Sequence, residues 1–183
     1  GDATELALLH LVHQSGMSPE GLRQQFPRGR EIPFDSTRKI MSVVCRLPQG
    51  PALLVKGAMD VLLERSTHIH HQGDIRSITL ADKRNLSRLG DNCSRKGLRV
   101  LALAYRPLKG DFSAISDSGL ERELVFLGFA AMMDPPRPEA RAAVMDARRA
   151  GIRPVMITGD HRVTAMSIAR QIGILREGEK AVT

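Results

Sequence analysis

Residues 39–56, KIMSVVCRLPQGPALLVK, indicate which kind of fold the chain adopts. In the first half, apolar side chains fall on every second position, which is the period of a β-strand: Met41, Val43, Cys45 and Leu47. PQGP then supplies turn-forming residues, and ALLVK brings back an apolar run. Two such runs joined by a short turn predict an antiparallel β-hairpin.

The stretches on both sides of this hairpin add helices and strands. Upstream, Asp2 and Glu5 fit a helix-capping pair, Gly16 ends that helix, and Ser18 with Pro19 opens a second, short one. Downstream we expect a helix over 58–65, a turn over 68–74, a strand over 75–80, a helix over 80–96 with Leu86, Leu89 and Cys93 inward, a strand over 98–106, a loop over 107–119 and a strand over 124–133. Hairpins with flanking helices define an α+β domain.

The pattern changes at MDPPRPE, residues 133–139. Adjacent prolines continue neither a strand nor a helix interior, so residues 134–137 are expected to form a hinge between two bodies. The expected elements after it are a helix over 138–150, the strand IRPVMIT over 152–158 and a helix over 162–172. Strand, short loop and helix in this order are typical of a parallel α/β sheet.

Composition excludes several classes of protein. With 42% hydrophobic and 26% charged residues, the 183-residue chain can bury a core, and no apolar run approaches the length of a membrane span. Cys45 and Cys93 form no metal-ligand spacing and are expected to be reduced thiols. The net charge of +7 favours an anionic partner, but the cations are scattered among acids, which argues against nucleic acid.

PFDSTRK, residues 33–39, places one of only five phenylalanines in a polar, basic stretch. An exposed Phe34 ring could stack on a purine while the neighbouring cations, Arg38 and Lys39, reach its phosphates. Alternatively, Phe34 fills the core at the start of a strand and the cations lie on a solvated face. Taken alone, this stretch favours the second interpretation.

Two further cations stand beside apolar strands. Lys56 ends the run LLVK and precedes Gly57, so its ammonium could emerge into a cavity and bind a phosphate or a base. A lysine that extends along the surface into water fits the same pattern. Arg99, at the start of an apolar strand, is either a phosphate ligand or a charge at the sheet edge.

ITGD, residues 157–160, follows the expected parallel strand. Ligands of open α/β sheets bind beyond the carboxyl ends of the strands. Thr158, Gly159 and Asp160 could therefore hold Mg²⁺, a ribose or a phosphate. The alternative is that Asp160 only caps the next helix.

The histidines His68, His70 and His71 lie close together in HIHHQGD. No cysteine pair or matching acid accompanies them, so we expect an exposed loop rather than a metal site.

Six stretches, taken in order, resemble P-type cation ATPases, in particular the calcium-pump branch. They span nearly the whole chain: GDATELAL (1–8), PFDSTRKIMSVV (33–44), KGAMDVLL (56–63), GLRVLALAYR (97–106), MMDPPRPE (132–139) and MITGDHRVTAMSIARQIGI (156–174). No single stretch is specific. Six of them in the order and spacing of one family identify the chain as similar to that family.

The resemblance implies the organisation of the chain and the roles of individual residues. Residues 1–133 would be an N-terminally truncated nucleotide-binding domain, 134–137 a hinge, and 138–183 part of a haloacid-dehalogenase-like phosphorylation domain. It assigns contacts with ATP to Glu5, Phe34 (under the adenine), Lys39, Lys56, Gly57 and Arg99. It assigns the hinge to Asp134, Pro135, Pro136 and Arg137, and the surroundings of the transferred phosphoryl group to Thr158, Gly159 and Asp160.

The resemblance also implies partners that lie outside this sequence. Both ends of the chain look cut, and the expected partners are the missing part of the phosphorylation domain, the actuator domain and the transmembrane helices. ATP with Mg²⁺ would be the cofactor, with the Mg²⁺ ligands mostly elsewhere and no metal site in this piece. The intact protein would sit in a membrane, with this domain on the cytoplasmic side. Ca²⁺ is the expected cargo, with Mn²⁺, Mg²⁺ and monovalent cations left open.

The sequence departs from the family pattern in several places. Two family loops are missing: the Asp-Lys-Thr-Gly-Thr loop with the phosphorylated aspartate, and the later Gly-Asp-Gly loop. The piece alone is therefore expected to bind ATP weakly without hydrolysing it. It is also expected to be a monomer. Met59 and Asp60 stand where the family usually has proline and an acid, and Ser36 stands where some calcium pumps carry arginine. Two other interpretations are a basic, non-catalytic module that binds another anionic partner and a phosphatase-like hydrolase. The hydrolase is disfavoured because Asp160 lacks an acidic companion two residues on.

Overall fold

A computed structural model of the chain describes residues 3–133, 136–158 and 162–176. The chain divides into two compact units, one of residues 1–90 and 100–131 and one of residues 91–99 and 132–183. The predicted boundary at residues 134–137 stays a prediction, because Asp134 and Pro135 lie outside the described residues.

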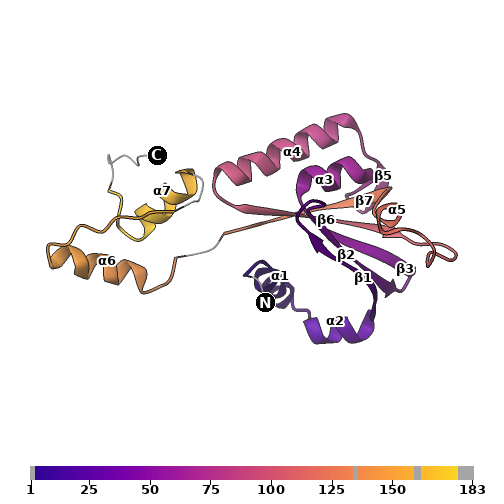
Figure 1. Ribbon diagram of the computed structural model, residues 1–183, viewed down its shortest axis with the longest axis horizontal. Coiled ribbons are helices and arrows are strands. Elements are labelled where there is room, and N and C mark those ends of the chain that lie inside the picture. The colour runs from indigo at the N-terminus through magenta and orange to yellow at the C-terminus, as the bar shows by residue number, and fades with distance from the viewer. Residues whose placement is uncertain (1–2, 134–135, 159–161, 177–183) are drawn as a thin grey trace. The chain divides into compact units, whose positions relative to one another are not determined.

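A seven-stranded sheet runs through the first unit in the strand order β1-β2-β3-β6-β7-β4-β5 (Figure 1). Its strands are β1 (Arg28–Asp35), β2 (Ile40–Leu47), β3 (Gly50–Gly57), β4 (Ser66–His71), β5 (Asp74–Ser77), β6 (Arg99–Pro107) and β7 (Leu124–Met132). The pairs β1–β2, β2–β3, β3–β6 and β4–β5 are antiparallel, and β4 pairs with β7 in parallel. The predicted hairpin is confirmed as β2–β3, and the predicted α+β class is confirmed with it.

Helices lie on both faces of this sheet. They are α1 (Ala3–Gln14), α2 (Pro19–Gln25), α3 (Met59–Arg65), α4 (Leu80–Arg95) and the short α5 (Asp117–Leu120). Figure 1 shows α3 and α4 on one side of the strands and α1 and α2 on the other. The start of α2 follows the predicted capping pattern, because the Ser18 hydroxyl accepts the Gly21 N–H at 3.2 Å and Pro19 is the first helical residue.

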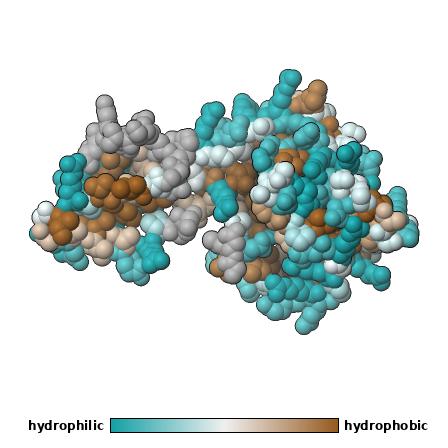
Figure 2. Space-filling view, in the orientation of Figure 1, coloured by the Kyte–Doolittle hydropathy of each residue, from teal (hydrophilic) through white to brown (hydrophobic). Residues whose placement is uncertain are grey.

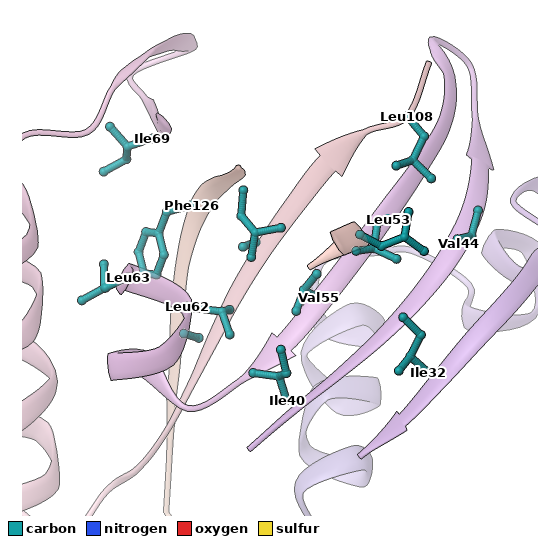
Figure 3. Packing of buried hydrophobic residues seen from close by; sticks show 14 residues of the cluster. Ile32, Ile40, Val44, Leu53, Val55, Leu62, Leu63, Ile69, Leu108 and Phe126 are labelled. Atoms are coloured by element: carbon teal, nitrogen blue, oxygen red, sulfur yellow. The ribbon is translucent and has the colours of Figure 1, made fainter. Parts of the chain in front are cut away.

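The main core lies between the sheet and α3 (Figure 3). Leu53 of β3, Leu62 of α3 and Phe126 of β7 are each fully buried. Burying one such side chain contributes about 1.5–3 kcal/mol relative to leaving it exposed. Gly90 lets α4 approach α3, because a Cβ at this position would come within 2.4 Å of the Met59 sulfur.

The two faces of the hairpin are buried to different degrees. Ile40 and Val44 face the main core, whereas Met41 and Val43 on the other face are only half-buried. Cys45 is also buried, and this burial raises the pKa of its thiol against a smaller lowering by the Arg28 charge. The second face is therefore less completely covered than the first, and α1 and α2 lie on that side (Figure 1).

Four sequence-based expectations about the first unit were wrong or incomplete. Strand β1 was not expected, because it is an edge strand with only Ile32 buried and so lacks an alternating pattern. The predicted turn over 68–74 is wrong for residues 68–71, which form β4; Gln72 and Gly73, with φ of 52° and 94°, make the tight turn to β5. Helix α5 interrupts the expected loop, and Leu89 is 49% exposed rather than inward.

Helix α4 begins with a polar cap whose strength depends on pH. The Asp82 carboxylate accepts hydrogen bonds from Arg76 at 2.7 and 2.9 Å and from the Thr79 N–H at 2.9 Å. The bonds from Arg76, then those from Thr79, hold the pKa of Asp82 well below its usual range. A depressed carboxyl pKa stabilises the folded state above the unfolded pKa, and this stabilisation is lost as the pH falls.

Asp82→Asn should therefore lower the melting temperature at pH 7, with a gap from wild type that begins to narrow as the pH falls below about 4. Thermal melts of both proteins between pH 7 and pH 3 measure this gap. Arg76→Gln should remove most of the pH-dependent part. A gap of constant size across this range would show that the cap does not depend on the carboxylate charge.

The second unit contains α6 (Ala140–Arg149) and α7 (Arg162–Gln171). The predicted strand over 152–158 is wrong as described, because these residues pair with no strand. A parallel strand needs neighbours, and all strands of the sheet lie in the first unit apart from their terminal residues. Apolar side chains gather on the surface of this unit (Figure 2), and Val155 and Ile157 are 72% and 93% exposed.

Candidate functional site

At one end of the sheet, the turn between β1 and β2 lies beside the end of β3 and the first half of β6. Residues in register across β1, β2, β3 and β6 form a row there: Asp35, Ile40, Gly57 and Ala102. Phe34 and Lys39 are chain neighbours of the first two residues of this row, and Lys56 precedes the third. The structure thus brings Phe34, Lys39 and Lys56 to the same end of three adjacent strands, although 22 positions separate the first from the last.

Phe34 lies outside the core. Its side chain is 63% exposed, whereas Phe126 is fully buried. A single exposed apolar side chain is common on protein surfaces, so exposure alone assigns no role. The ring is nevertheless free to receive a flat partner, which the alternative of a core-filling Phe34 would not allow.

The turn between β1 and β2 is held by its own backbone and by Asp35. The Asp35 carboxylate accepts the N–H groups of Thr37 and Arg38 at 3.0 and 2.8 Å, and its carbonyl accepts the Lys39 N–H at 2.6 Å. Lys39 closes the turn with a φ of 59°, which non-glycine residues rarely adopt. Such backbone strain persists only where surrounding contacts enforce it.

Gly57 is required by a close approach between this turn and β3. A Cβ on Gly57 would lie 2.4 Å from the Lys39 carbonyl oxygen, and the next residue, Ala58, donates its N–H to that oxygen at 3.0 Å. Glycine therefore lets the backbone of Lys39 sit against β3. The position of the Lys39 backbone depends on Gly57 whether or not Gly57 itself contacts a ligand.

Lys56 forms an ion pair with Glu5 of α1. The Lys56 side chain is 25% exposed and that of Glu5 is 48% exposed, so both groups retain contact with water. Lys56 of β3 lies directly opposite the half-buried Met41 of β2. The Lys56 side chain is therefore on the sheet face opposite the main core. The pair joins α1 to β3 and places a cation and a carboxylate side by side.

The remaining predicted site residues are placed less fully. Arg99 is the exposed first residue of β6 and is grouped with the second unit, so its role stays a prediction. Thr158 and Arg137 are exposed and Pro136 is half-buried. The predictions for Asp134, Pro135, Gly159 and Asp160 lie outside the described residues.

One buried polar cluster beside this site was not predicted from the sequence. Glu121, which follows α5, is fully buried, and its carboxylate accepts hydrogen bonds from Arg38 at 2.6 Å, Ser42 at 2.6 Å and Arg65 at 3.1 Å. In the sequence, Glu121 is one of several charges before an apolar strand. Only the fold shows that it contacts the β1–β2 turn, which begins just after Phe34.

This arrangement suits a flat ligand with an anionic tail. An exposed ring can stack on a base, ammonium groups can bind phosphates, and a carboxylate can accept a hydrogen bond from an amino group. Within the described ranges, no group of three or more His, Cys, Asp or Glu side chains could hold a metal ion. The histidines of β4 are exposed and form no such group.

Comparison with known proteins places the chain in a family. Residues 1–139 match the family described as "P-type ATPase, cytoplasmic domain N". This match covers most of the chain, so the chain belongs to the P-type ATPases. Among the residues that the structure describes, no helix is both long and apolar enough to cross a membrane.

Individual relatives of the chain are named for the ions that they transport. The chain is 38% identical over its whole length to "Calcium-transporting ATPase 1" of Lactococcus lactis. It is 41% identical, over 97% of its length, to the protein of that name in Bacillus cereus, and 40% identical, over 98%, to "Cation-transporting ATPase pma1" of Synechocystis. The chain spans only about a fifth of the length of these relatives (21%, 20% and 19%).

Proposed function

We propose that this chain is the ATP-binding part of a P-type ATPase that uses ATP hydrolysis to move a cation, Ca²⁺, across a membrane. The observation that carries the proposal is the exposed Phe34 ring at the same end of the sheet as Lys39 and the Glu5–Lys56 pair. Membership of the P-type ATPases and two relatives named as calcium-transporting support it. A third relative is named only as cation-transporting, so a cation is the class of cargo that all three names share.

In this proposal each residue binds a different part of ATP. Phe34 stacks on the adenine, and Lys39, Lys56 and Arg99 donate hydrogen bonds to the base or the phosphates. Glu5 lies beside Lys56 and is able to accept from the exocyclic amino group of adenine. Since phosphoryl transfer is driven by positioning and charge neutralisation, this chain's contribution is to hold the nucleotide.

The transfer itself is assigned to parts of the protein beyond this chain. Residues 134–137 are the proposed hinge about which the nucleotide-binding domain, on the cytoplasmic side, carries ATP to an aspartate elsewhere. Residues 138–183 are the proposed piece of the phosphorylation domain, with Thr158, Gly159 and Asp160 near the phosphoryl group.

Isothermal titration calorimetry of the chain with ATP tests this function against the rival of a basic module. We expect weak binding of one ATP per chain, no release of phosphate, and only a moderate loss of affinity as salt is raised. A single-stranded oligonucleotide is the comparison ligand, since binding to a phosphate backbone weakens steeply with salt. Absence of ATP binding, or tight and strongly salt-dependent oligonucleotide binding, would overturn the proposal.

A further inference from the structure

The fully buried carboxylate of Glu121 is a group for which ATP binding alone has no use. Burying a charge is costly unless it is paired and hydrogen-bonded. Here the cost is offset by two guanidinium groups and a hydroxyl, from Arg38, Arg65 and Ser42. The two arginines come from different elements, the β1–β2 turn and the end of α3. A buried charge with this many partners holds both elements in one relative position.

The Arg38 guanidinium connects Glu121 to both ends of the β1–β2 turn. Besides its bond to Glu121, it donates to the carbonyl of Pro33, immediately before Phe34, and to the carbonyl of Ile40, immediately after Lys39, at 3.2 Å in the latter case. The Arg38 side chain is only 19% exposed, so its charge points into the protein rather than toward a ligand. This corrects the expectation that Arg38 reaches phosphates together with Lys39.

We propose that Glu121 and Arg38 are positioning residues for the nucleotide site: the buried carboxylate fixes the guanidinium, and the guanidinium fixes the two strand ends that present Phe34 and Lys39. The inference rests on the proposed ATP site, and it deepens that proposal. Neither residue touches the ligand. Their effect on binding comes through the shape of the turn, whose closing residue Lys39 has the unfavourable φ of 59°.

Arg65 provides a matched control inside the same cluster. It binds the other oxygen of the Glu121 carboxylate at 3.1 Å, and its further bond, at 3.5 Å, goes to the Glu121 carbonyl. Its side chain is 27% exposed, close to the value for Arg38. Arg65 therefore shares the charge environment of Arg38, and in the described part of the chain its hydrogen bonds go to Glu121 rather than to the turn. Removing either guanidinium leaves Glu121 with one arginine and Ser42.

The test compares Arg38→Gln with Arg65→Gln in the 183-residue chain. Both variants should lose similar stability in urea unfolding. Arg38→Gln should weaken ATP binding by about tenfold or more in calorimetry, while Arg65→Gln should stay within about twofold of wild type. Without ATP, Arg38→Gln alone should speed hydrogen exchange of the Lys39 and Ala58 amides, which bond within and across the turn.

The two readouts separate failure of this inference from failure of the proposed function. If the wild-type chain binds no ATP but the two amides exchange faster only in Arg38→Gln, the positioning of the turn is upheld and the ATP site is not. If both variants weaken ATP binding equally and leave the exchange rates alike, Glu121 and Arg38 act only on overall stability and the inference is wrong. Ile69→Ala, a core truncation in β4, calibrates how far general destabilisation affects either readout.

Discussion

Replacing Phe34 with alanine should weaken ATP binding by about five- to 150-fold, because stacking of one base on an aromatic ring is worth about 1–3 kcal/mol. The melting temperature should change little, because the ring is 63% exposed and so contributes little buried area to the folded state. Calorimetric titration of both proteins with ATP, together with thermal melts, measures both quantities on the same samples.

Two further variants separate stacking from general apolar contact at Phe34. Phe34→Tyr keeps a flat ring and should bind ATP nearly as well as wild type, whereas Phe34→Leu keeps apolar volume without a flat face and should bind weakly. Ile75→Ala removes another exposed apolar side chain, 52% exposed, from β5 at the opposite edge of the sheet, and should leave ATP binding unchanged. Wild-type affinity in Phe34→Ala would contradict the stacking role.

Local sequence patterns were sufficient for the elements that depend mainly on local physics. The hairpin over residues 39–56 has apolar runs on both sides of the two turn residues Pro48 and Gln49, and this short turn sets the register in which Leu47 pairs with Gly50. The start of α2 at Ser18 and Pro19 depends on one side-chain bond and one fixed φ. The end of α1 near Gly16, with φ of 77°, depends on glycine's freedom in the left-handed region.

Elements that depend on distant partners were missed or wrong. An edge strand such as β1 buries too little for its pattern to show, and its pairing partner β2 supplies what the sequence pattern lacks. Residues 152–158 have a strand-like pattern but pair with no strand in the part of the chain that the structure describes. Residues 152–158 show that a pattern of side chains predicts a strand only when neighbours for its backbone are present, and β1 shows that such a neighbour can form a strand without the pattern.

The residues at the candidate site also fall into two groups: those that local sequence patterns predicted and one that only tertiary contacts reveal. Phe34, Lys39 and Lys56 stood out because their residue types are unusual for their local surroundings, and the pairing of β1, β2 and β3 explains why they gather at one end of the sheet. Glu121 stood out in no respect, because its environment comes from Arg38, Ser42 and Arg65, each at least 56 positions away. A charged residue before an apolar strand is usually solvated, and only tertiary contacts reverse that expectation.

Glu121→Ala should lower the free energy of unfolding more than the loss of an exposed charged residue does. Removing one partner of a buried ion pair costs about 3–5 kcal/mol, because the remaining charges lose their counterion while still partly buried. Arg38 and Arg65 are 19% and 27% exposed and can regain some water, so we expect a loss near the lower end of this range. Ser42, 1% exposed, also loses its acceptor. Chemical unfolding in urea measures the change in the free energy of unfolding.

Glu123→Ala is the matched control for this substitution, since Glu123 lies two positions on and pairs with Arg106 at 2.7 Å but is 69% exposed. An exposed pair of this kind contributes about 0–1 kcal/mol, so its loss should be small. Replacing the three charged members of the cluster with apolar residues, as Glu121→Leu with Arg38→Met and Arg65→Met, should recover much of the stability lost in Glu121→Ala, because no buried charge then lacks a partner. The same triple variant should still bind ATP poorly, since nothing then joins the carbonyls of Pro33 and Ile40. Equal losses of stability in Glu121→Ala and Glu123→Ala would show that the Glu121 carboxylate is not held in a desolvated environment in solution.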